Sequence, residues 1–446
     1  MLESVLVANR GEIARRVIRT ANRLGVRTVA VYSEADAELP YVAEADEAVL
    51  IGPPAPKDSY LNSTAILAAA KQTGAVGIHP GYGFLAENPD FAAEVIAAGL
   101  TWIGPSPEAI EQMGDKIRAR NLMAAAGVPV AAGSSEPVTD AAAAVRLAGQ
   151  IGYPIMIKAA AGGGGIGMSV ATNAEQLRTG FETAQSRAER FFGSADILLE
   201  RYLTSARHVE VQILGLADGR VIALGERDCS VQRRHQKVAE ETPSPGVGPD
   251  LRQRMLAAAI RAGEAVGYQG AGTVECLVDT STSEFVFLEM NTRLQVEHPV
   301  TELVTGIDLV EQQLLVAAGD DVSFDLASVS PAGHALEFRI YAEDPVRFLP
   351  SPGRITGWEE PSGPGVRVDA GYVAGNTVTP NYDPLLAKLV VHAADRDSAL
   401  ARARAAVAGF AVTGIKTNLP FHADLLNSAE FGSGHYDTAV VSHLRP

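Results

Sequence analysis

Apolar residues recur in short runs, separated by amphipathic stretches, over roughly the first 105 residues of the chain. Runs of strand length occupy residues 5–8, 28–32, 75–78 and 101–103. A helical spacing of apolar positions lies between them, near residues 12–24, 64–71 and 91–98. Alternating strands and helices predict parallel strands joined by helical crossovers, so we expect an open α/β unit at the N-terminus.

The rest of the chain mixes helices with strands that can pair in an antiparallel way. Helical patterns occupy residues 108–126, 174–191 and 251–266, and strand patterns occupy residues 153–158, 197–203, 207–214, 220–226 and 272–278. Beyond about residue 333 the pattern predicts strands at 335–341, 366–368 and 385–391, followed by helices at 397–409 and 420–427. We therefore predict two further units, of which the C-terminal one is mainly β.

One predicted strand changes character half-way along. Residues 285–288 are apolar and aromatic, and from there polar residues occupy every second position. Because successive side chains of an extended chain point to opposite faces, one face carries carboxylates, amides and a guanidinium. These residues are Glu289, Asn291, Arg293, Gln295 and Glu297. The set suits a divalent cation at Glu289 and Asn291. It also offers an oxyanion site at Arg293 and a base at Glu297.

A straight strand cannot bring both ends of this stretch into one site. Eight residues at roughly 3.3 Å each separate Glu289 from Glu297 by about 26 Å. We therefore expect the strand to end, and the chain to bend, after Asn291. The alternative is an edge strand with a solvated polar face, but such faces usually mix Lys, Ser and Thr.

Composition limits the partners of the protein. Its 446 residues carry 37 lysines and arginines against 53 aspartates and glutamates, a net charge of −16. This acidity argues against nucleic-acid or anionic-membrane binding, so an anionic substrate must meet local cations. No apolar run could cross a bilayer, and the N-terminus does not resemble a signal peptide. Cys229 and Cys276 lack metal-type spacing, so we expect reduced packing residues in a cytoplasmic protein.

A carboxylate within an apolar strand accompanies the polar stretch. Glu275 lies in the run 272–278, where a carboxylate is costly to bury unless it is paired or bound to a metal. With Glu289 and Asn291 on the following strand, it completes a set of oxygen ligands. Hard oxygen ligands and substrate phosphates are what Mg²⁺ prefers, so the three residues predict a magnesium site.

Two glycine-containing stretches offer ligand sites. Residues 79–88 (HPGYGFLAEN) follow a strand at the end where open α/β sheets bind ligands, although a turn with a capping Asn would also explain them. Lys158 ends a strand and precedes five glycines between residues 162 and 167. Glycines let backbone N–H groups converge on phosphate oxygens, so this loop predicts a phosphate site rather than a plain hinge. No Gly-Lys-Ser/Thr follows, so the loop is not a P-loop.

Cations are concentrated in one short segment of this acidic chain. They are Arg227, Arg233, Arg234, His235 and Lys237. We interpret them as an anion clamp, although a charge run is more often a solvated face. Arg339 lies on a predicted strand, and a buried arginine is either paired structurally or meets an anion. The strand end from Glu200 to Leu203 could hydrogen-bond an exocyclic amine and pack on a purine.

Together and in this order, these stretches resemble biotin carboxylase, the ATP-grasp enzyme or subunit of biotin-dependent carboxylases. They are ANRGEIA at 8–14, the 79–88 motif, MGDK at 113–116, the glycine loop, ERDCSVQRRHQKV at 226–238, EMNTRLQVEHP at 289–299 and YDP at 382–384. The resemblance covers essentially the whole chain. It implies a Rossmann-like N-terminal α/β domain at 1–113, an ATP-grasp domain at 114–325 with a mobile lid at about 131–203, and a mainly β C-terminal domain at 331–446.

The resemblance also implies roles for individual residues. ATP would be held by Lys116, Lys158, Gly163, Gly164, Gly165, His208, Gln232 and His235, with its adenine against Glu200 and Leu203. Mg²⁺, or Mn²⁺, would be bound by Glu275, Glu289 and Asn291. Bicarbonate would lie against Arg293, Gln295 and Val296, with Glu297 as its base and Lys237 steadying the carboxyphosphate intermediate. Arg339 would stabilise the biotin enolate near Tyr82, and Arg16 and Arg19 match positions at the family's dimer interface.

The implied activity is ATP- and bicarbonate-dependent carboxylation of biotin on a carrier protein, the first half-reaction of an acetyl-CoA or other acyl-CoA carboxylase. No biotin-attachment motif occurs before Pro446, so the carrier and the carboxyltransferase are expected on separate chains, and the enzyme is expected to be a homodimer. Ile166 and Ser169 stand where many members have basic residues, and an apolar residue at 166 looks more like urea carboxylases. The alternatives are a urea-type carboxylase component, a non-catalytic ATP-binding regulatory subunit, or another ATP-grasp ligase joining a carboxylate to an amine.

Overall fold

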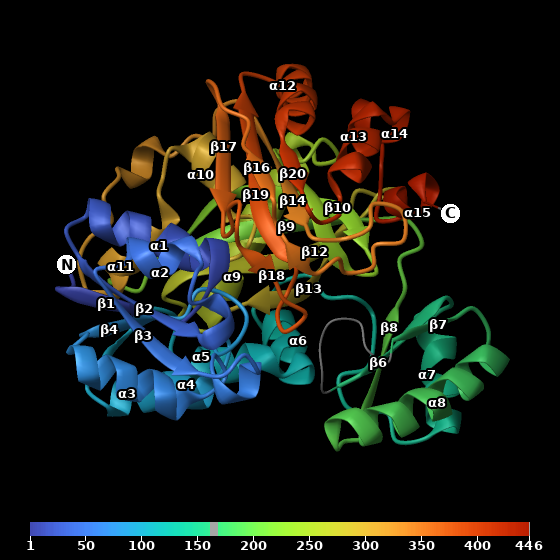
Figure 1. Cartoon of the computed structure of the whole chain (residues 1–446). Coiled ribbons are helices and arrows are strands. Elements are labelled where there is room, and N and C mark those ends of the chain that lie inside the picture. Colours follow the sequence, from blue (N-terminus) through green and yellow to red (C-terminus); the bar gives the residue numbers. More distant parts are fainter. Residues whose placement is uncertain (161–167, 446) are drawn as a thin grey trace.

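The computed structural model describes residues 1–160 and 168–445 of the chain. Figure 1 shows an N-terminal α/β unit, a body built on one large sheet, and a smaller unit that stands to one side of the body. The predicted mixture of α/β and mainly β units is confirmed.

Five parallel strands form the N-terminal sheet, in the order β3-β2-β1-β4-β5. They are β1 (Ser4–Val7), β2 (Arg27–Ser33), β3 (Glu47–Gly52), β4 (Gly77–His79) and β5 (Thr101–Trp102), with helices α1 (Gly11–Arg23), α2 (Pro40–Glu44), α3 (Ser63–Thr73) and α4 (Pro89–Ala97) between them. The order reverses between β1 and β4, which is where open sheets bind ligands. There the Asn9 amide donates to the carbonyls of Pro80 and Tyr82, both at 2.7 Å, and fixes the 79–88 turn beside β1.

The helix predicted at 108–126 is wrong as a single element, because the structure has two helices, α5 (Pro107–Gly114) and α6 (Lys116–Ala125). Asp115 between them is extended, and its carboxylate accepts hydrogen bonds of 2.9 Å from the backbone N–H groups of Ile117 and Arg118. Asp115 therefore caps α6. The break places Lys116 at the first position of a helix, where it lines the cleft described below.

An eight-stranded antiparallel sheet forms the body, in the order β13-β12-β9-β10-β11-β14-β19-β17. Its strands are β9 (Ala206–Gly215), β10 (Val221–Arg233), β11 (Gln236–Thr242), β12 (Gly270–Asp279), β13 (Phe285–Asn291), β14 (His334–Tyr341), β17 (Val366–Ala370) and β19 (Leu385–Ala393). The pairing of β11 with β14 continues the central strands into the C-terminal ones, so both parts of the chain share one sheet.

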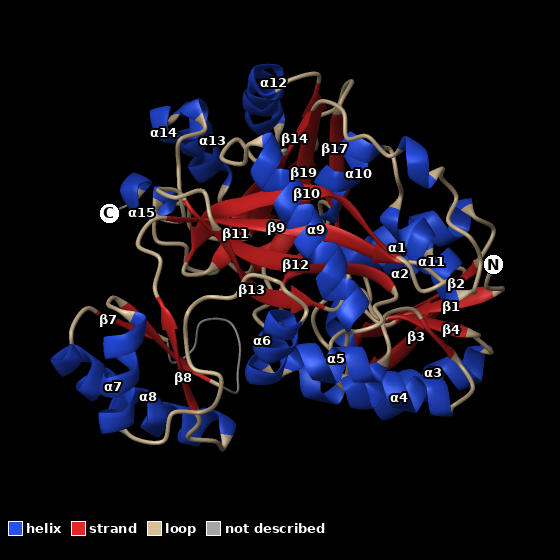
Figure 2. Cartoon of the chain, turned by 180° about the vertical axis from the view of Figure 1, so that it is seen from behind, coloured by secondary structure: helices blue, strands red, loops and turns tan. Residues whose placement is uncertain are grey.

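The helix α9 (Pro249–Ala265) covers one face of this sheet, as Figure 2 shows from behind. Alternate residues of β9, such as Val209 and Val211, pack with α9 residues such as Met255 in one apolar cluster. The residues between them, His208, Glu210 and Gln212, point to the opposite face. Burial on both faces explains why every residue of β9 is buried.

Further elements complete the C-terminal part. They are α10 (His298–Thr305), α11 (Leu309–Ala317), β15 (Gly353–Arg354), β16 (Gly357–Glu359), β18 (Thr377–Val378), α12 (Arg396–Gly409), β20 (Ala411–Thr413), α13 (Leu419–Asn427), α14 (Ala429–Ser433) and α15 (Val440–Leu444). Helices α12 and α13 pack over the C-terminal strands, where Phe338, Leu389 and Leu425 share one core.

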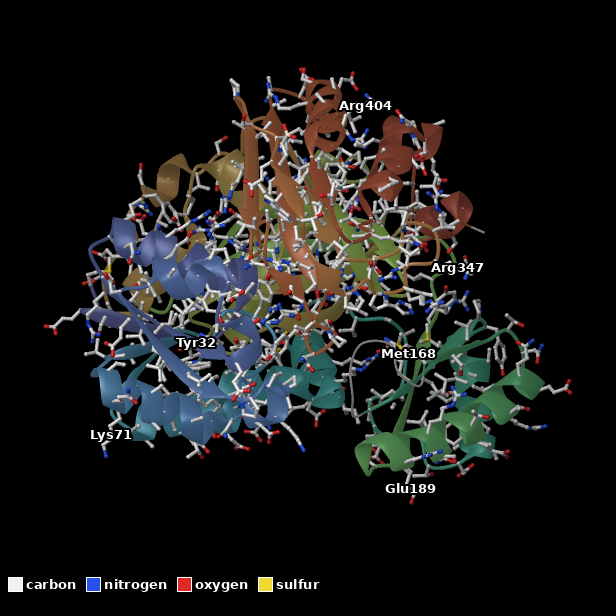
Figure 3. All side chains as sticks on the ribbon, in the orientation of Figure 1. Tyr32, Lys71, Met168, Glu189, Arg347 and Arg404 are labelled. Atoms are coloured by element: carbon white, nitrogen blue, oxygen red, sulfur yellow. The ribbon has the colours of Figure 1, made fainter. Side chains whose placement is uncertain are left out.

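The smaller unit has a core of its own. Its sheet has the order β7-β6-β8, formed by β6 (Ile155–Ala159), β7 (Ser169–Ala171) and β8 (Ile197–Arg201), and it packs with α7 (Ala141–Ile151) and α8 (Ala174–Phe192). Ile157, Phe181 and Leu199 are fully buried there. Figure 3 shows Met168 on the side of this unit that is nearest the body, whereas Glu189 points outward from α8.

Cys229 on β10 and Cys276 on β12 are buried and free, which confirms that they are packing residues rather than a disulfide. Burial raises the pKa of both thiols, so they stay protonated at neutral pH. Among the described helices, none has the length and apolar character that crossing a bilayer requires.

Replacing Asp115 with Ala should lower the free energy of unfolding by about 1 kcal/mol, because two N–H groups of α6 lose their acceptor. Asp395 caps α12 in the same way, accepting from the N–H of Ser398 at 2.8 Å, and serves as a matched control. Urea unfolding should show similar losses for Asp115→Ala and Asp395→Ala. Only Asp115→Ala should also weaken the nucleotide binding that the sequence resemblance implies for Lys116, because only α6 begins with a cleft lysine. Equal nucleotide affinities for the two variants would contradict the role given to this cap.

Candidate active site

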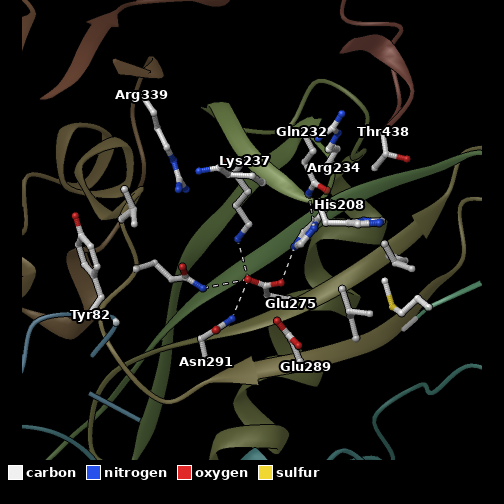
Figure 4. A pocket seen from close by; sticks show the side chains of 18 of the residues that line it. Tyr82, His208, Gln232, Arg234, Lys237, Glu275, Glu289, Asn291, Arg339 and Thr438 are labelled. Carbon is white, nitrogen blue, oxygen red and sulfur yellow. Dashed lines mark hydrogen bonds and ion pairs between the residues drawn. The ribbon is translucent and has the colours of Figure 1, made fainter. Parts of the chain in front are cut away.

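A cleft of about 1180 Å³ opens where the N-terminal unit, the smaller unit and the large sheet meet. Tyr82 lines it from the N-terminal unit, and Lys158 and Glu200 line it from the smaller unit. Glu275 and Arg339 line it from the two halves of the large sheet. Figure 4 shows how Tyr82, Glu275 and Arg339 are arranged in this cleft.

A row of charged side chains runs across four neighbouring strands beside the cleft. Glu289 on β13 is opposite Glu275 on β12, which is opposite Glu210 on β9, which is opposite Arg227 on β10. Directly paired residues point to the same face of a sheet. Glu289 is exposed to the cleft, whereas Glu210 and Arg227 are fully buried.

The interpretation of all five cations as an anion clamp is wrong for two of them. The guanidinium of Arg227 donates from Nε to Glu210 Oε1 at 2.6 Å and from Nη1 to Gln212 at 2.7 Å. Arg233 donates to Glu343 at 2.9 Å and to the carbonyl of Phe348 at 2.7 Å. Both arginines therefore have structural partners, because a buried guanidinium needs several acceptors. Arg234, His235 and Lys237 do line the cleft.

Lys237 occupies the centre of the site. Its ammonium donates to Glu210 Oε2 at 2.5 Å, to Glu275 Oε1 at 2.7 Å and to Glu297 Oε1 at 2.7 Å. Burial opposes a charge here, but the three carboxylates hold the pKa of Lys237 well above its ordinary value. The ammonium therefore stays charged and keeps three buried carboxylates close together.

An irregularity in β11 directs Lys237 into the cleft. Val231 of β10 pairs with Ala239, but the next residue, Gln232, pairs with Lys237, so Val238 is an extra residue. Such a β-bulge changes which face the following side chains occupy. It allows Lys237 and Glu240, which are three positions apart, to contact the same group of charges.

The predicted magnesium ligands lie together. Glu275 Oε1 accepts from the amides of Asn291 at 2.8 Å and Gln295 at 3.0 Å, and Glu275 Oε2 lies 2.8 Å from His208 Nε2. Burial would raise the pKa of Glu275, but Lys237 and His208 lower it, so the carboxylate is ionised. The carboxylate of Glu289 faces the cleft, and the carboxylate of Glu275 is ionised. Together with the amide oxygen of Asn291 they fit a hard cation such as Mg²⁺.

The strand β13 ends at Asn291 and the chain then bends into α10, as predicted. The bend brings Glu297 back to the cluster around Lys237, and its side chain is completely buried. Glu297 Oε2 accepts from Arg339 Nη2 at 3.0 Å. Burial would raise the pKa of Glu297, but Lys237, Arg339 and Arg227 hold it well below its ordinary value.

Arg339 is paired and also lines the cleft, so the two alternatives left open by the sequence are both present. Besides Glu297, it donates from Nε to Glu240 Oε1 at 2.6 Å. Its backbone carbonyl accepts from Asn418 at 2.9 Å, which fixes this part of β14. Across the cleft Tyr82 donates to Glu12.

The residues predicted for the oxyanion follow the bend. Arg293 donates from Nε to Glu87 at 2.8 Å and from Nη2 to Asn291 Oδ1 at 3.1 Å. Glu87 belongs to the 79–88 motif, so this ion pair joins the two stretches that the sequence singled out. The carbonyl of Val296 accepts from Lys388 Nζ at 2.9 Å, and Lys388 also lies 3.0 Å from Glu12.

The other end of the cleft holds the residues predicted for ATP. Lys158 pairs with Glu200, and Lys116 and Leu203 line the wall nearby. Gln232 lies 2.7 Å from His208 Nδ1. Although burial opposes it, the Glu275 carboxylate raises the pKa of His208. Gly163, Gly164, Gly165 and Ile166 lie outside the described residues.

Sequence reasoning missed three charged residues of the site, Glu210, Glu240 and Lys388. Lys388 carries the same signal that identified Glu275, a single charge within an apolar strand, whereas the strand of Glu210 also contains Arg207. Glu240 is followed by Glu241, which points to the opposite face and accepts from Arg396 and Tyr436. The sequence alone does not separate these two neighbours.

Comparison with known proteins agrees with this geometry. Residues 1–110 match the family "Biotin carboxylase, N-terminal domain", and residues 337–443 match "Biotin carboxylase C-terminal domain". Residues 115–324 match "Carbamoyl-phosphate synthase L chain, ATP binding domain". A biotin carboxylase of Halalkalibacterium halodurans is 52% identical over 446 residues, covering 100% of this chain and 98% of that protein. The chain belongs to the biotin carboxylase family.

Two solved structures show how closely the biotin carboxylase fold is kept. The biotin carboxylase of Campylobacter jejuni has a TM-score of 0.96 and 45% identity, covering 99% of both chains. The biotin carboxylase domain dimer of the 2-oxoglutarate carboxylase of Hydrogenobacter thermophilus has a TM-score of 0.94 and 43% identity, covering 99% of this chain and 98% of that one. That domain was solved with MgADP, ADP and bicarbonate. The activity of the family is the ATP-dependent carboxylation of biotin.

Replacing Lys237 with Met should destabilise this biotin carboxylase by roughly 3–5 kcal/mol at pH 8, because three buried carboxylates lose their shared cation. Without it their pKa values rise above those of the unfolded chain, so the folded state binds more protons and stability falls as pH rises. The loss of unfolding free energy relative to wild type should therefore be smaller at pH 5 than at pH 8, as measured by urea unfolding. Lys116→Met, which removes a partly exposed lysine, should change stability little. A deficit for Lys237→Met that is independent of pH would contradict the cluster.

Proposed function

We propose that this chain carboxylates biotin through carboxyphosphate, with Glu297 as the base towards bicarbonate and Arg339 as the group that stabilises the biotin enolate. The observation that carries the proposal is the convergence of Lys237 and Arg339 on the two oxygens of Glu297 in one cleft. A base, a cation for phosphate and a cation for the second substrate are thus brought together by the fold.

The nucleotide end of the site follows from its charges. We assign ATP to Lys116, Lys158, His208, Gln232 and His235, and the adenine to Glu200 and Leu203. Mg²⁺ would be held by Glu275, Glu289 and Asn291, and it supplies neutralisation of phosphate charge when bound. The ion pair between Lys158 and Glu200 gives this lysine a partner that polyphosphate oxygens could replace. The charged Lys158 therefore has a partner in the cleft before the nucleotide binds.

Bicarbonate entry should itself turn Glu297 into a base. As described, Lys237 and Arg339 keep the pKa of Glu297 too low for efficient proton abstraction. An anion that binds beside Arg293 and Gln295 adds negative charge and competes for the same cations, which raises the pKa of Glu297. The proton of bicarbonate can then move to Glu297 while its oxygen attacks the γ-phosphoryl group and the bond from that group to the departing ADP breaks. Lys237 would steady the carboxyphosphate that results, and Arg293, Gln295 and Val296 would form the bicarbonate wall.

The partners are inferred from the family. We propose domains at 1–113, 114–325 and 331–446, with a lid at 131–203, and a cytoplasmic homodimer that serves a biotin carrier and a carboxyltransferase on other chains. The dimer is supported by the Hydrogenobacter domain, whose structure is that of a dimer. Within this chain Arg16 is buried and pairs with Glu302 and Asp308, both at 2.7 Å, whereas Arg19 is exposed. Arg19 is therefore the better placed of the two to meet a second copy.

The final carboxyl acceptor is an acyl-CoA in our proposal, with a urea-type carboxylase as the alternative that Ile166 favours. A non-catalytic regulatory subunit is disfavoured, because Glu297, Arg339 and the three oxygen ligands are all present, with Arg339 bonded to Glu297 and Asn291 bonded to Glu275. A ligase without a biotin step is also disfavoured, since Arg339 lines the cleft beside Glu297, the proposed bicarbonate base.

ATP cleavage should require both bicarbonate and Mg²⁺ and should be stimulated by free biotin. Replacing Glu297 with Gln keeps the shape but removes the base, so bicarbonate-dependent cleavage should fall by roughly 10²–10⁴-fold. Phosphate release measured with and without bicarbonate tests both statements. Full-rate turnover without bicarbonate would overturn the carboxylase assignment.

Replacing Arg339 with Ala should depress carboxybiotin formation more than ATP cleavage, because Arg339 acts on charge that develops after carboxyphosphate has formed. Arg339→Lys should rescue only part of the loss, since a point charge cannot reproduce a planar fork of donors. The ratio of carboxybiotin formed to ATP cleaved measures the effect. Equal loss of both activities in the Glu297 and Arg339 variants would show that the two residues form a structural ion pair instead.

A further inference from the structure

The guanidinium of Arg339 is held by two buried carboxylates and itself lines the cleft. Nη2 donates to Glu297 Oε2 at 3.0 Å, and the side chain of Glu297 is completely buried. Nε donates to Glu240 Oε1 at 2.6 Å, and Nη2 lies 2.6 Å from the same oxygen. The side chain of Glu240 is completely buried, so it acts on the cleft through the arginine.

The sheet places a second carboxylate next to Glu240. Residue Glu240 of β11 is directly opposite Glu337 of β14, and Arg339 follows Glu337 by two positions on the same strand. All three side chains therefore share one face of the sheet. The bulge at Val238 is what turns Glu240 to this face together with Lys237.

Glu337 has an unusual environment for a carboxylate. It is completely buried, and neither of its oxygens has a hydrogen-bond partner among the described residues. The second oxygen of Glu240 also lacks a partner among them. Two buried carboxylates beside one guanidinium cannot both ionise without strong repulsion, so one of them keeps a proton.

The surrounding charges decide which carboxylate is neutral. The titratable and charged groups that act on the pair are Arg339, Lys237, Glu297, Cys229, Tyr341 and Lys388. Burial raises the pKa of Glu337 well above its ordinary value, although Lys388 opposes the shift. Burial raises the pKa of Glu240 only to about 7, because Arg339 is in direct contact with it. Glu337 is therefore neutral, and Glu240 is the member that can ionise.

We propose that Glu240 is a positioning residue for the biotin half of the reaction, with protonated Glu337 as its neutral neighbour. Glu240 accepts a hydrogen bond from Nε of Arg339, so the guanidinium is shared between Glu240 and Glu297 instead of pairing with Glu297 alone. The Nη atoms of Arg339 are then left facing the cleft. Glu297, the base, and Arg339, the group that stabilises the enolate, are not both occupied by a single ion pair with each other. The inference rests on the proposed role of Arg339.

The test compares Glu240→Ala, Glu240→Gln and Glu337→Gln in the full-length enzyme, with free biotin as the probe. Glu240→Ala should raise the KM for biotin by about tenfold, which corresponds to about 1.4 kcal/mol of lost positioning. It should also lower the carboxybiotin formed per ATP cleaved. Bicarbonate-dependent ATP cleavage without biotin should fall less than carboxybiotin formation does, because Glu297 and Lys237 remain in place although Arg339 can then close onto Glu297. Glu240→Gln should restore most of the KM, because an amide oxygen can still accept from Nε.

A pH profile separates this role from a merely structural one. An ionised Glu240 makes a charge-assisted bond that is roughly twice as strong as a neutral one, so the wild-type KM for biotin should fall as pH rises through about 7. Glu240→Gln should show no such change. Glu337→Gln mimics a protonated carboxyl group and should keep the wild-type profile, which makes it the matched control.

Three results would overturn the proposal: a wild-type profile in Glu240→Gln, loss of the profile in Glu337→Gln, or an unchanged biotin KM in Glu240→Ala. Arg339→Ala shows where such a failure lies. If Arg339→Ala uncouples carboxylation and the Glu240 variants do not, the positioning role alone is wrong. If Arg339→Ala also leaves the biotin KM and the coupling unchanged, the proposed role of Arg339 is wrong as well.

Discussion

The ammonium of Lys237 is the charge on which the cleft depends. It lies within 2.7 Å of carboxylate oxygens from Glu210, Glu275 and Glu297, which come from β9, β12 and the turn before α10. Three buried carboxylates repel one another and lose their hydration, so they could not share this space without a cation. Because the four groups come from separate elements, the site exists only when the large sheet is complete.

The charges around this centre are close to balanced before any substrate arrives. Arg227 neutralises Glu210 from one side, and Arg339 contacts Glu297 from the other. An incoming polyphosphate or bicarbonate therefore has to take cations from carboxylates that already hold them. A divalent cation at Glu275 and Glu289, where we propose one, would offset that loss and would give a physical reason for combining Mg²⁺ with anionic substrates.

The architecture separates two tasks along one cleft. The smaller unit, with its own core, brings Lys158 and Glu200 to the end that suits a nucleotide. The C-terminal strands bring Arg339 to the other end, opposite Tyr82 at the switch point of the N-terminal sheet. The pairing of β11 with β14 fixes the distance between the centre and the Arg339 end, because Lys237 and Arg339 lie on neighbouring strands of one sheet.

The sequence by itself determined the type of each unit and the bend after Asn291, because these depend on local periodicity and on the chemistry of single residues. It misjudged Arg227 and Arg233, since a run of cations gives no indication of which partners lie on other strands. It also missed the break at Asp115 and the role of Glu240. Only the tertiary structure decided these points, because a β-bulge and cross-strand register determine which of two neighbouring charges faces the site.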